Sequence, residues 1–346
     1  MRQRKIMLGL SFVLLSVIMI IGMRQPVFAA QEHMDFEVQM VSSSHQVDRD
    51  KRFFDLGLSA DQQATIEVKV HNFSEKPIKV HSEIENGITQ MGGGMIYRPT
   101  KTGIIRDTQQ TLIDVAQVKA ADRVVTIGPN AVKRIQATIK MPSGTTQGMI
   151  YGAWHFIEYG KQSDTDHSSV AGNYAYNIGI MLHGQHYQTY PELKYQKVEP
   201  IIKNGHAALG IQLNNVKPMI IKNAQVKAVI AKEGFFKNKR VYQASNVDVA
   251  PNSQFTVPIS WGYDQMKPGK YTVAVEVKGH NYWNQLPMTW HFKKQITVNR
   301  QQATQINHES LKKPTNRWAY VATASGILML LSFGLVYRVL KLTRGL

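Results

Sequence analysis

The sequence contains no cysteine in its 346 residues. This absence excludes disulfide-stapled folds and enzymes that use a cysteine nucleophile. Any extracellular domain of this chain must therefore be stabilised by its own hydrophobic core. Hydrophobic residues make up 43% of the chain, a content typical of globular proteins that excludes an intrinsically disordered one.

Catalytic and metal-binding motifs are also missing. No Gly-x-Ser-x-Gly nucleophile elbow occurs. Residues 164–167 (Asp-Thr-Asp-His) lack the glycine and further ligands of a calcium loop. Residues 183–186 (His-Gly-Gln-His) lack the glutamate of a zinc-hydrolase helix. The sequence therefore predicts a non-enzymatic protein with no catalytic residue, no metal site and no cofactor.

Acidic residues are few, with 24 Asp and Glu against 41 Lys and Arg. Seven of the basic residues lie in the two terminal segments, namely Arg2, Arg4, Lys5, Arg24, Arg338, Lys341 and Arg344. The middle of the chain then carries 34 basic against 24 acidic residues, an excess of about ten positive charges. Such a surface attracts anionic wall polymers, lipid headgroups or acidic proteins. The alternative is that the positive charge only keeps the protein soluble. No nucleic-acid-binding motif is present.

The first of two long apolar runs covers residues 6–23. Basic residues precede it, and small residues at Ala29 and Ala30 follow it. This order is typical of a secretory signal peptide, which we expect to span residues 1–30 and to be removed. An uncleaved signal anchor is the alternative.

The second apolar run, residues 318–337, has no charged residue. At about 1.5 Å per residue, some 20 helical residues span a hydrocarbon core of about 30 Å. Trp318 and Tyr337 mark its two ends, and the basic residues of 338–346 follow. This pattern predicts a transmembrane helix with a cytoplasmic tail, although a buried core helix is the alternative. The chain would be a single-pass type I protein of the cell membrane, its ectodomain facing the cell wall and exterior.

Short alternating segments separated by turn signals fill the region between these runs. In residues 65–71, for example, Ile66, Val68 and Val70 alternate with polar residues. Such segments predict β-strands, and helical periodicity is almost absent. We expect the strand from residue 78 to end at a turn formed by Asn86 and Gly87.

Further local features shape these expectations. Residues 112–118 are predicted to form a strand, and residues 92–94 (Gly-Gly-Gly) are predicted to form a flexible loop. Pro258 in strand 255–261 indicates a sheet edge, because proline cannot donate a ladder hydrogen bond.

The predicted fold class is all-β, with two tandem immunoglobulin-like β-sandwich domains plus one C-terminal transmembrane helix. The Cys…Trp…Cys signature of antibody domains is absent, so the sandwich subtype stays open. The expected segments are a signal peptide (1–30), a first sandwich (31–160), a second sandwich (161–300), a juxtamembrane stalk (301–317), the transmembrane helix (318–337) and a cytoplasmic basic tail (338–346).

Tryptophans are the main candidates for ligand contact. Trp154, Trp261 and Trp290 lie in strand-like runs, where core packing is the expected role. Trp283 lies in a polar loop, and loops at the ends of a sandwich often carry binding residues. Trp283 is thus the single ligand-binding candidate that the sequence offers, with an exposed or a packed position equally open.

Motifs along the chain resemble those of the WxL-interacting protein family of Gram-positive surface proteins. In the first half these are Arg52-Phe-Phe-Asp-Leu56, Val68-Lys-Val-His-Asn72, Ile96-Tyr97, Ile127-Gly-Pro-Asn130, Met141-Pro142 and Gly148-Met-Ile-Tyr-Gly152. In the second half they are Tyr176-Asn-Ile-Gly-Ile-Met-Leu182, Pro191-Glu-Leu193, Leu213-Asn-Asn215, Gly269-Lys-Tyr271 and Trp290-His-Phe292. The resemblance covers residues 34–345 and rests on the order of these motifs.

The resemblance implies a peptidoglycan-binding first domain, a host-binding second domain and partners that carry WxL domains. On this basis we expect a membrane-anchored cell-surface adaptor that binds WxL-domain proteins and peptidoglycan or anionic wall polymers, and host extracellular-matrix proteins. The alternative is an export-side assembly factor or chaperone for cell-wall proteins. No binding residue is transferred from the family.

Overall fold

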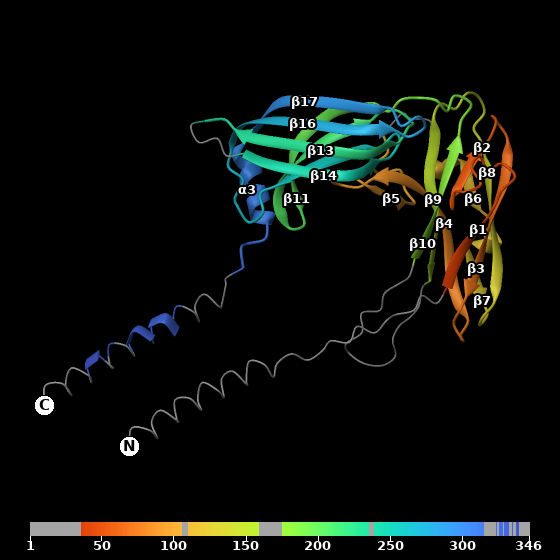
Figure 1. Cartoon of the computed structure of the whole chain (residues 1–346), viewed down its shortest axis with the longest axis horizontal. Helices are drawn as coiled ribbons and strands as arrows, with labels where there is room; N and C mark the ends of the chain where they lie inside the picture. The colour runs from red at the N-terminus through yellow and green to blue at the C-terminus, as the bar shows by residue number, and fades with distance from the viewer. Residues whose placement is uncertain are drawn as a thin grey trace, which may run out of the picture.

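The computed structural model contains two β-sandwiches, and the second extends to one side of the first (Figure 1). The structure describes residues 36–105, 110–158, 175–234 and 239–314, together with isolated helical residues between 323 and 338. The expected signal peptide, the expected domain boundary at residues 160 and 161, and much of the 318–337 run lie outside the described residues. In the part of the chain that is described, no helix combines the length and apolarity needed to cross a membrane.

The first sandwich consists of two sheets that share one core. One sheet has the order β1 (Phe36–Val41), β3 (Gln63–Asn72), β8 (Val132–Lys140), β6 (Ala116–Val118). The other has the order β2 (Phe54–Gly57), β10 (Ala175–His183), β9 (Met149–Glu158), β4 (Ile78–Thr89), β5 (Met95–Arg98), and β7 (Val124–Ile127) also pairs with β4. Alternate side chains of both sheets meet around the fully buried Trp154, which confirms the predicted core role of this residue.

The strand β10 joins a different domain from the one expected. Sequence analysis places it in the second sandwich, whereas it pairs antiparallel with β9 and parallel with β2 of the first. The alternation of apolar residues identifies a strand but carries no information about its partner. The sequence of residues 159–174, before β10, contains no pattern that predicts a return of the chain to the first sheet.

Two local predictions in the first sandwich are wrong. The dipeptide Asn86-Gly87 does not end β4, which continues to Thr89 and pairs there with β5. Glycine is required at residue 87 for packing, because a Cβ there would lie 2.3 Å from the Tyr151 ring.

Residues 112–118 are also not one strand: they form the single-turn helix α2 (Leu112–Val115) followed by β6. The short 3-10 helix η1 (Ala120–Asp122) then leads to β7.

The second sandwich has a three-stranded and a four-stranded sheet. Their orders are β11 (Leu193–Lys203), β12 (His206–Asn215), β15 (Gln254–Ser260), and β14 (Lys239–Val249), β13 (Ile221–Lys232), β16 (Gly269–Asn281), β17 (Pro287–Val298). The strand with Pro258 is at a sheet edge, as predicted, since β12 is the only strand in its sheet that pairs with it among the described strands.

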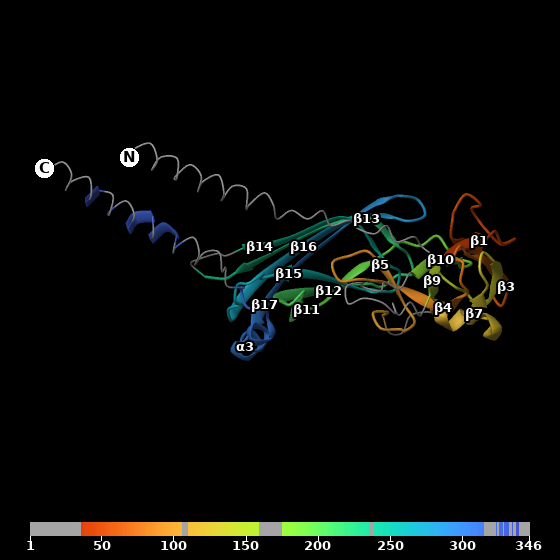
Figure 2. The ribbon, with the colours of Figure 1, turned by 90° about the horizontal axis from the view of Figure 1, so that it is seen from below.

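Part of the expected stalk belongs to this domain instead. Residues 300–309 form the helix α3 (Arg300–Glu309), which lies at the end of the second sandwich remote from the first (Figures 1 and 2). Ala303 and Ile306, three residues apart, are buried in the core. Asn299 and Gln302 form a capping box at the start of the helix, a signal that the sequence contains and that the stalk interpretation overlooked.

Backbone hydrogen bonds join the two sandwiches. The Gly92–Gly94 loop between β4 and β5, expected to be flexible, is inserted into the second sandwich: Gly92 N–H donates to Thr256 O (2.8 Å) and Gly94 N–H to Asp248 O (3.0 Å). All three glycines have positive φ, and a Cβ on Gly93 would lie 2.7 Å from Val247 Cβ.

Side-chain contacts also hold the junction. Met149, Met181, Met219 and Ile220 form a buried cluster with side chains from both sandwiches. Beside it lies Asp55, which is fully buried and contacts His183 and Lys51. Burial alone would raise the pKa of Asp55, but the bonds from His183 and Lys51 outweigh burial and hold it below the ordinary 3.8. Lys51 also lies 3.4 Å from the Tyr282 hydroxyl of the second sandwich.

Replacing Gly93 should weaken this junction. Gly93→Ala forces a contact with Val247 and strains a φ of 102°, so it should lower the free energy of unfolding by about 2–4 kcal/mol. Gly144→Ala is the matched control, because Gly144 has a φ of 89° and nothing within 4 Å of the added Cβ. It should cost only about 1 kcal/mol in the same urea titration. Equal losses for both variants would show that the loop is not packed at the junction.

Asp55→Asn should destabilise the chain at neutral pH by about 3 kcal/mol, because His183 and Lys51 would lose their buried anion. The folded pKa of Asp55 lies below its unfolded value, so this stabilisation is present above about pH 4 and is lost as pH falls through the folded pKa. The difference from wild type should therefore shrink below about pH 4. Thermal unfolding across pH measures it, with the exposed Asp61→Asn as control. A difference that does not change with pH would contradict the ion-pair account.

Candidate functional site

A gap in strand pairing lies along one edge of β4. The other edge of this strand pairs with β9 over residues 80–86. Along the gapped edge, β7 pairs with residues 78–81 and β5 with residues 86–89. Residues 82–85 between them thus have no strand partner on that edge in the described sheet. Such a segment presents main-chain groups that an extended ligand can use.

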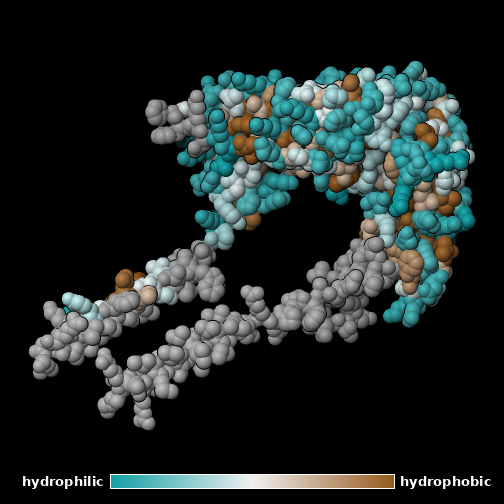
Figure 3. All heavy atoms as spheres, viewed as in Figure 1, coloured by the Kyte–Doolittle hydropathy of each residue, from teal (hydrophilic) through white to brown (hydrophobic). Residues whose placement is uncertain are grey.

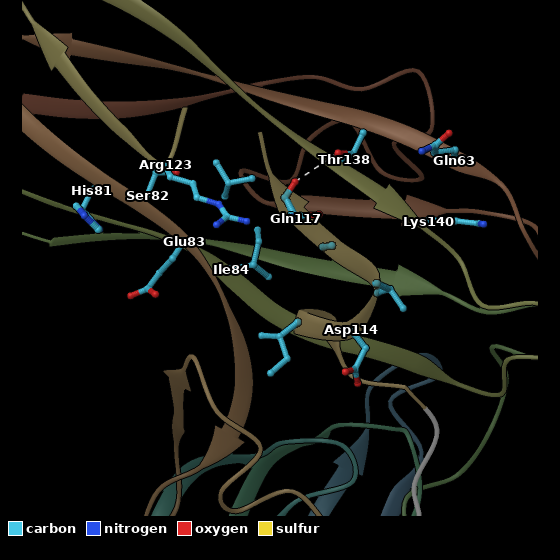
Figure 4. A pocket seen from close by; sticks show the side chains of 14 residues that line it. Gln63, His81, Ser82, Glu83, Ile84, Asp114, Gln117, Arg123, Thr138 and Lys140 are labelled. Atoms are coloured by element: carbon cyan, nitrogen blue, oxygen red, sulfur yellow. Dashed lines mark hydrogen bonds between the residues drawn. The ribbon is translucent and has the colours of Figure 1, made fainter. Parts of the chain in front are cut away.

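The helix α2 and the strand β6 lie beside this gap and leave a groove. Its walls are β4 on one side and α2 with β6 on the other, so that the groove runs between an edge of each sheet (Figure 4). The hollow has a volume of about 670 Å³. It is lined by Gln63, His81, Ser82, Glu83, Ile84, Ile113, Asp114, Val115, Ala116, Gln117, Val118, Arg123, Thr138 and Lys140.

Buried and capping hydrogen bonds fix the wall made by α2. Asn86, fully buried, accepts a bond from Ile113 N–H (3.1 Å) and donates to Thr100 O (3.2 Å). At the start of the helix, Asp114 accepts bonds from the backbone N–H (2.9 Å) and the hydroxyl (2.8 Å) of Thr111. These contacts hold α2 against β4 and keep the groove open at that end.

The floor of the groove is equally fixed. The indole N–H of the buried Trp154 donates to Ser82 Oγ at 2.7 Å. The backbone N–H of Ser82 donates to Arg123 O at 2.8 Å, which ties β4 to the segment before β7. On the wall opposite β4, the Thr138 hydroxyl of β8 donates to Gln117 O of the adjacent strand β6 at 3.5 Å (Figure 4).

The groove is cationic. Asp114 is paired with Lys101 at 2.7 Å. Burial alone would raise the pKa of Asp114, but the bonds from Lys101 and Thr111 outweigh it and keep the pKa below its ordinary value. The Glu83 carboxylate points away from Arg123 (Figure 4). Arg123 and Lys140 are exposed, and neither forms an ion pair with any described residue. The arrangement therefore offers two available cations and several amide or hydroxyl groups to an anionic, peptide-like ligand.

The predicted candidate Trp283 lies elsewhere. It packs against the methionine cluster of the junction, and its indole N–H donates to Thr189 O at 2.7 Å. Trp261 is buried in the second core, and Trp290 packs against that core, as predicted.

His183 faces Asp55 and stacks on Tyr187 with ring centroids 3.9 Å apart. Residues 164–167 lie outside the described residues.

Sequence reasoning missed the groove. Its cations, Arg123 and Lys140, come from separate segments of the chain, and the residues around each do not distinguish it from other exposed cations. The only local signal was Thr111-x-x-Asp114, a helix-start pattern within a segment that otherwise alternates like a strand.

The comparison with solved structures gives matches of low similarity. The Pseudomonas aeruginosa CupB2 chaperone is 16% identical, with 68% of this chain and 94% of that chain covered and a TM-score of 0.29. The YadV chaperone is 11% identical, with coverage of 77% and 100% and a TM-score of 0.32. At these TM-scores the likeness carries no information about function. No curated protein matches the chain in sequence.

Two family models match the chain, one for each half. Residues 36–158, which include the whole groove, match the WxL Interacting Protein, peptidoglycan binding domain. Residues 165–308 match the WxL Interacting Protein, host binding domain. Together the matches cover most of the chain, in the order that the sequence motifs predicted. The protein belongs to the WxL-interacting protein family, whose two domains bind at the cell surface.

Proposed function

We propose that this chain is a non-enzymatic, membrane-anchored adaptor that binds peptidoglycan in the groove between β4 and β6. The observation that carries the proposal is the pair of available cations, Arg123 and Lys140, in a groove between two sheet edges of the domain that matches the peptidoglycan-binding family. Two tandem sandwiches of immunoglobulin-like type would hold this groove and the host-binding surface apart.

The chemistry of peptidoglycan fits the groove. Its stem peptides carry free carboxylates, which accept charge-assisted hydrogen bonds from guanidinium and ammonium groups. Their amides can bond to Gln63, Gln117 and Thr138, which line the same hollow. The edge of β4 at residues 82–85 has no strand partner among the described strands, and apart from Ser82 N–H, which donates to Arg123 O, its main-chain groups are open to an extended peptide, as in strand addition.

The second sandwich carries a basic face that supports the proposed binding of host extracellular-matrix proteins. On β13, β16 and β17, the side chains Lys227, Lys278, His291 and Lys293 surround one acid, Glu276. The bond from Lys278 (2.9 Å) lowers the pKa of Glu276, and the neighbouring cations add to this effect. The excess of positive charge on this face suits an acidic partner.

Anchoring and partner binding complete the proposal. The uncharged run at residues 318–337 would hold the chain in the membrane, with 338–346 in the cytoplasm. WxL-domain proteins would bind the ectodomain through a packed interface or through strand addition at an edge such as β15. The match of residues 36–158 and 165–308 to a family named for this interaction supports the proposed partner binding.

Arg123→Ala and Lys140→Ala test the groove. Each should weaken binding of the full chain to purified, protein-free peptidoglycan about tenfold, since a charge-assisted hydrogen bond contributes about 1.5 kcal/mol or more. Cosedimentation over a salt series measures the affinity. Binding should also weaken as salt rises, and the double variant should show a smaller salt response.

Lys133→Ala is the matched control, because Lys133 lies exposed on β8, outside the groove, and the substitution removes the same charge. It should bind like wild type. If all three substitutions weaken binding equally, general charge attraction holds the wall polymer. If none does, the groove is not the binding site.

A further inference from the structure

A cluster of potential metal ligands lies on the outer face of the sheet that contains β4. Glu83 and Glu85 are two residues apart on β4, so both side chains project from the same face. His155 on β9 lies directly opposite Glu83 in the antiparallel register. One ligand atom from each of the three side chains lies within 4.8 Å of the others.

Glu85 is the unusual member of this cluster. The residue is only 8% exposed, and its carboxylate accepts no hydrogen bond from any described residue. The ion pair that it forms, with His155 Nδ1, has a separation of 4.0 Å. Burial raises the pKa of Glu85, and Glu83 adds to the rise while His155 opposes it. Glu85 is thus a mostly buried carboxylate whose ion-pair partner among the described residues, His155, is 4.0 Å away, and a bound cation would neutralise it more closely.

A neighbouring strand orients the histidine. Asn177 on β10 lies opposite His155, and Asn177 Oδ1 is 2.8 Å from His155 Nδ1. If the amide oxygen accepts from Nδ1–H, the ring keeps its lone pair on Nε2. Metal-binding histidines are oriented in this way, with the second ring nitrogen donating to an oxygen.

We propose that Glu83, Glu85 and His155 form a binding site for a divalent transition-metal ion, with Asn177 as the residue that orients His155. Two carboxylates and one imidazole suit Zn²⁺ or Mn²⁺, whereas Ca²⁺ prefers an all-oxygen site with more ligands. Ligand atoms of a tetrahedral zinc site are about 3.3 Å apart, so small side-chain rotations would close the cluster around the ion.

The site would link β4 to β9 and neutralise the buried Glu85. It does not depend on the proposed binding of peptidoglycan, because the Glu83 carboxylate points away from the cations of the groove. The three protein ligands would leave a fourth position for water or for an exogenous carboxylate.

Titration calorimetry and thermal unfolding of the full chain, without a histidine tag, test the site. Zn²⁺ and Mn²⁺ should bind at one site per chain and raise the Tm, and Ca²⁺ should do neither at the same concentration. Glu85→Gln and His155→Gln should each weaken Zn²⁺ binding at least about tenfold. Glu75→Gln, which removes an exposed carboxylate outside the cluster, is the control and should bind like wild type.

The Tm without metal separates a metal ligand from a purely structural residue. Glu85→Gln removes a buried charge, so the metal-free Tm should stay at or above that of wild type while the Zn²⁺-induced rise disappears. The proposal is overturned if Zn²⁺ does not bind, if Glu85→Gln binds it as tightly as wild type, or if Ca²⁺ binds equally well. A metal-free Tm that falls in Glu85→Gln, with Zn²⁺ affinity unchanged, would also overturn it.

Discussion

The backbone hydrogen bonds of the Gly92–Gly94 loop are the constraint on which the arrangement of the molecule depends. Gly92 and Gly94 donate to main-chain oxygens of the second sandwich, at Thr256 and Asp248. Because the loop follows β4, the second domain is attached to the strand that forms one wall of the groove. Further main-chain bonds, such as Met149 N–H to Pro218 O (2.8 Å) and Ile105 N–H to Asn252 O (2.9 Å), also cross the junction, and the buried methionine cluster packs beside them. The two sandwiches therefore present their surfaces in a fixed relation, each mostly hydrophilic in the view of Figure 3.

Strand β4 unites the functional features of the first sandwich. Its unpaired segment forms one wall of the groove, its buried Asn86 holds α2, and its outward side chains Glu83 and Glu85 make the metal-ligand cluster. This concentration follows from pairing: β5 and β7 share one edge of β4 without covering all of it. A ligand in the groove and an ion on the opposite face would thus act on the same strand.

The sequence predicted much of the fold because burial follows from alternation. The strands around Val68, Ile135 and Trp154 and the edge position of Pro258 could be predicted in this way. The errors occur where a distant partner decides the conformation. Gly87 lies within a strand because β5 pairs with it, and the Tyr151 ring occupies the place that a side chain would take. The Gly92–Gly94 loop is fixed because it bonds to the second domain.

The candidate site was harder to predict for the same reason. Arg123 and Lys140 are ordinary surface cations until folding brings them to one groove, and Glu85 and His155 are distant in sequence. The return of β10 to the first sheet, although its residues belong to the segment matching the host-binding family domain, also depends on pairing over distance. Family resemblance supplied the class of ligand, whereas only the structure supplied a location.

Hydrogen–deuterium exchange with soluble peptidoglycan fragments is the most direct test of the central claim. The account predicts that saturating fragments slow exchange in β4 at residues 82–85 and in α2 and β6, which form the two walls of the groove. Exchange in β11, β12 and β15 of the second sandwich should not change. Protection confined to the second sandwich, or binding without protection at the groove, would contradict the assignment of this groove as the peptidoglycan site.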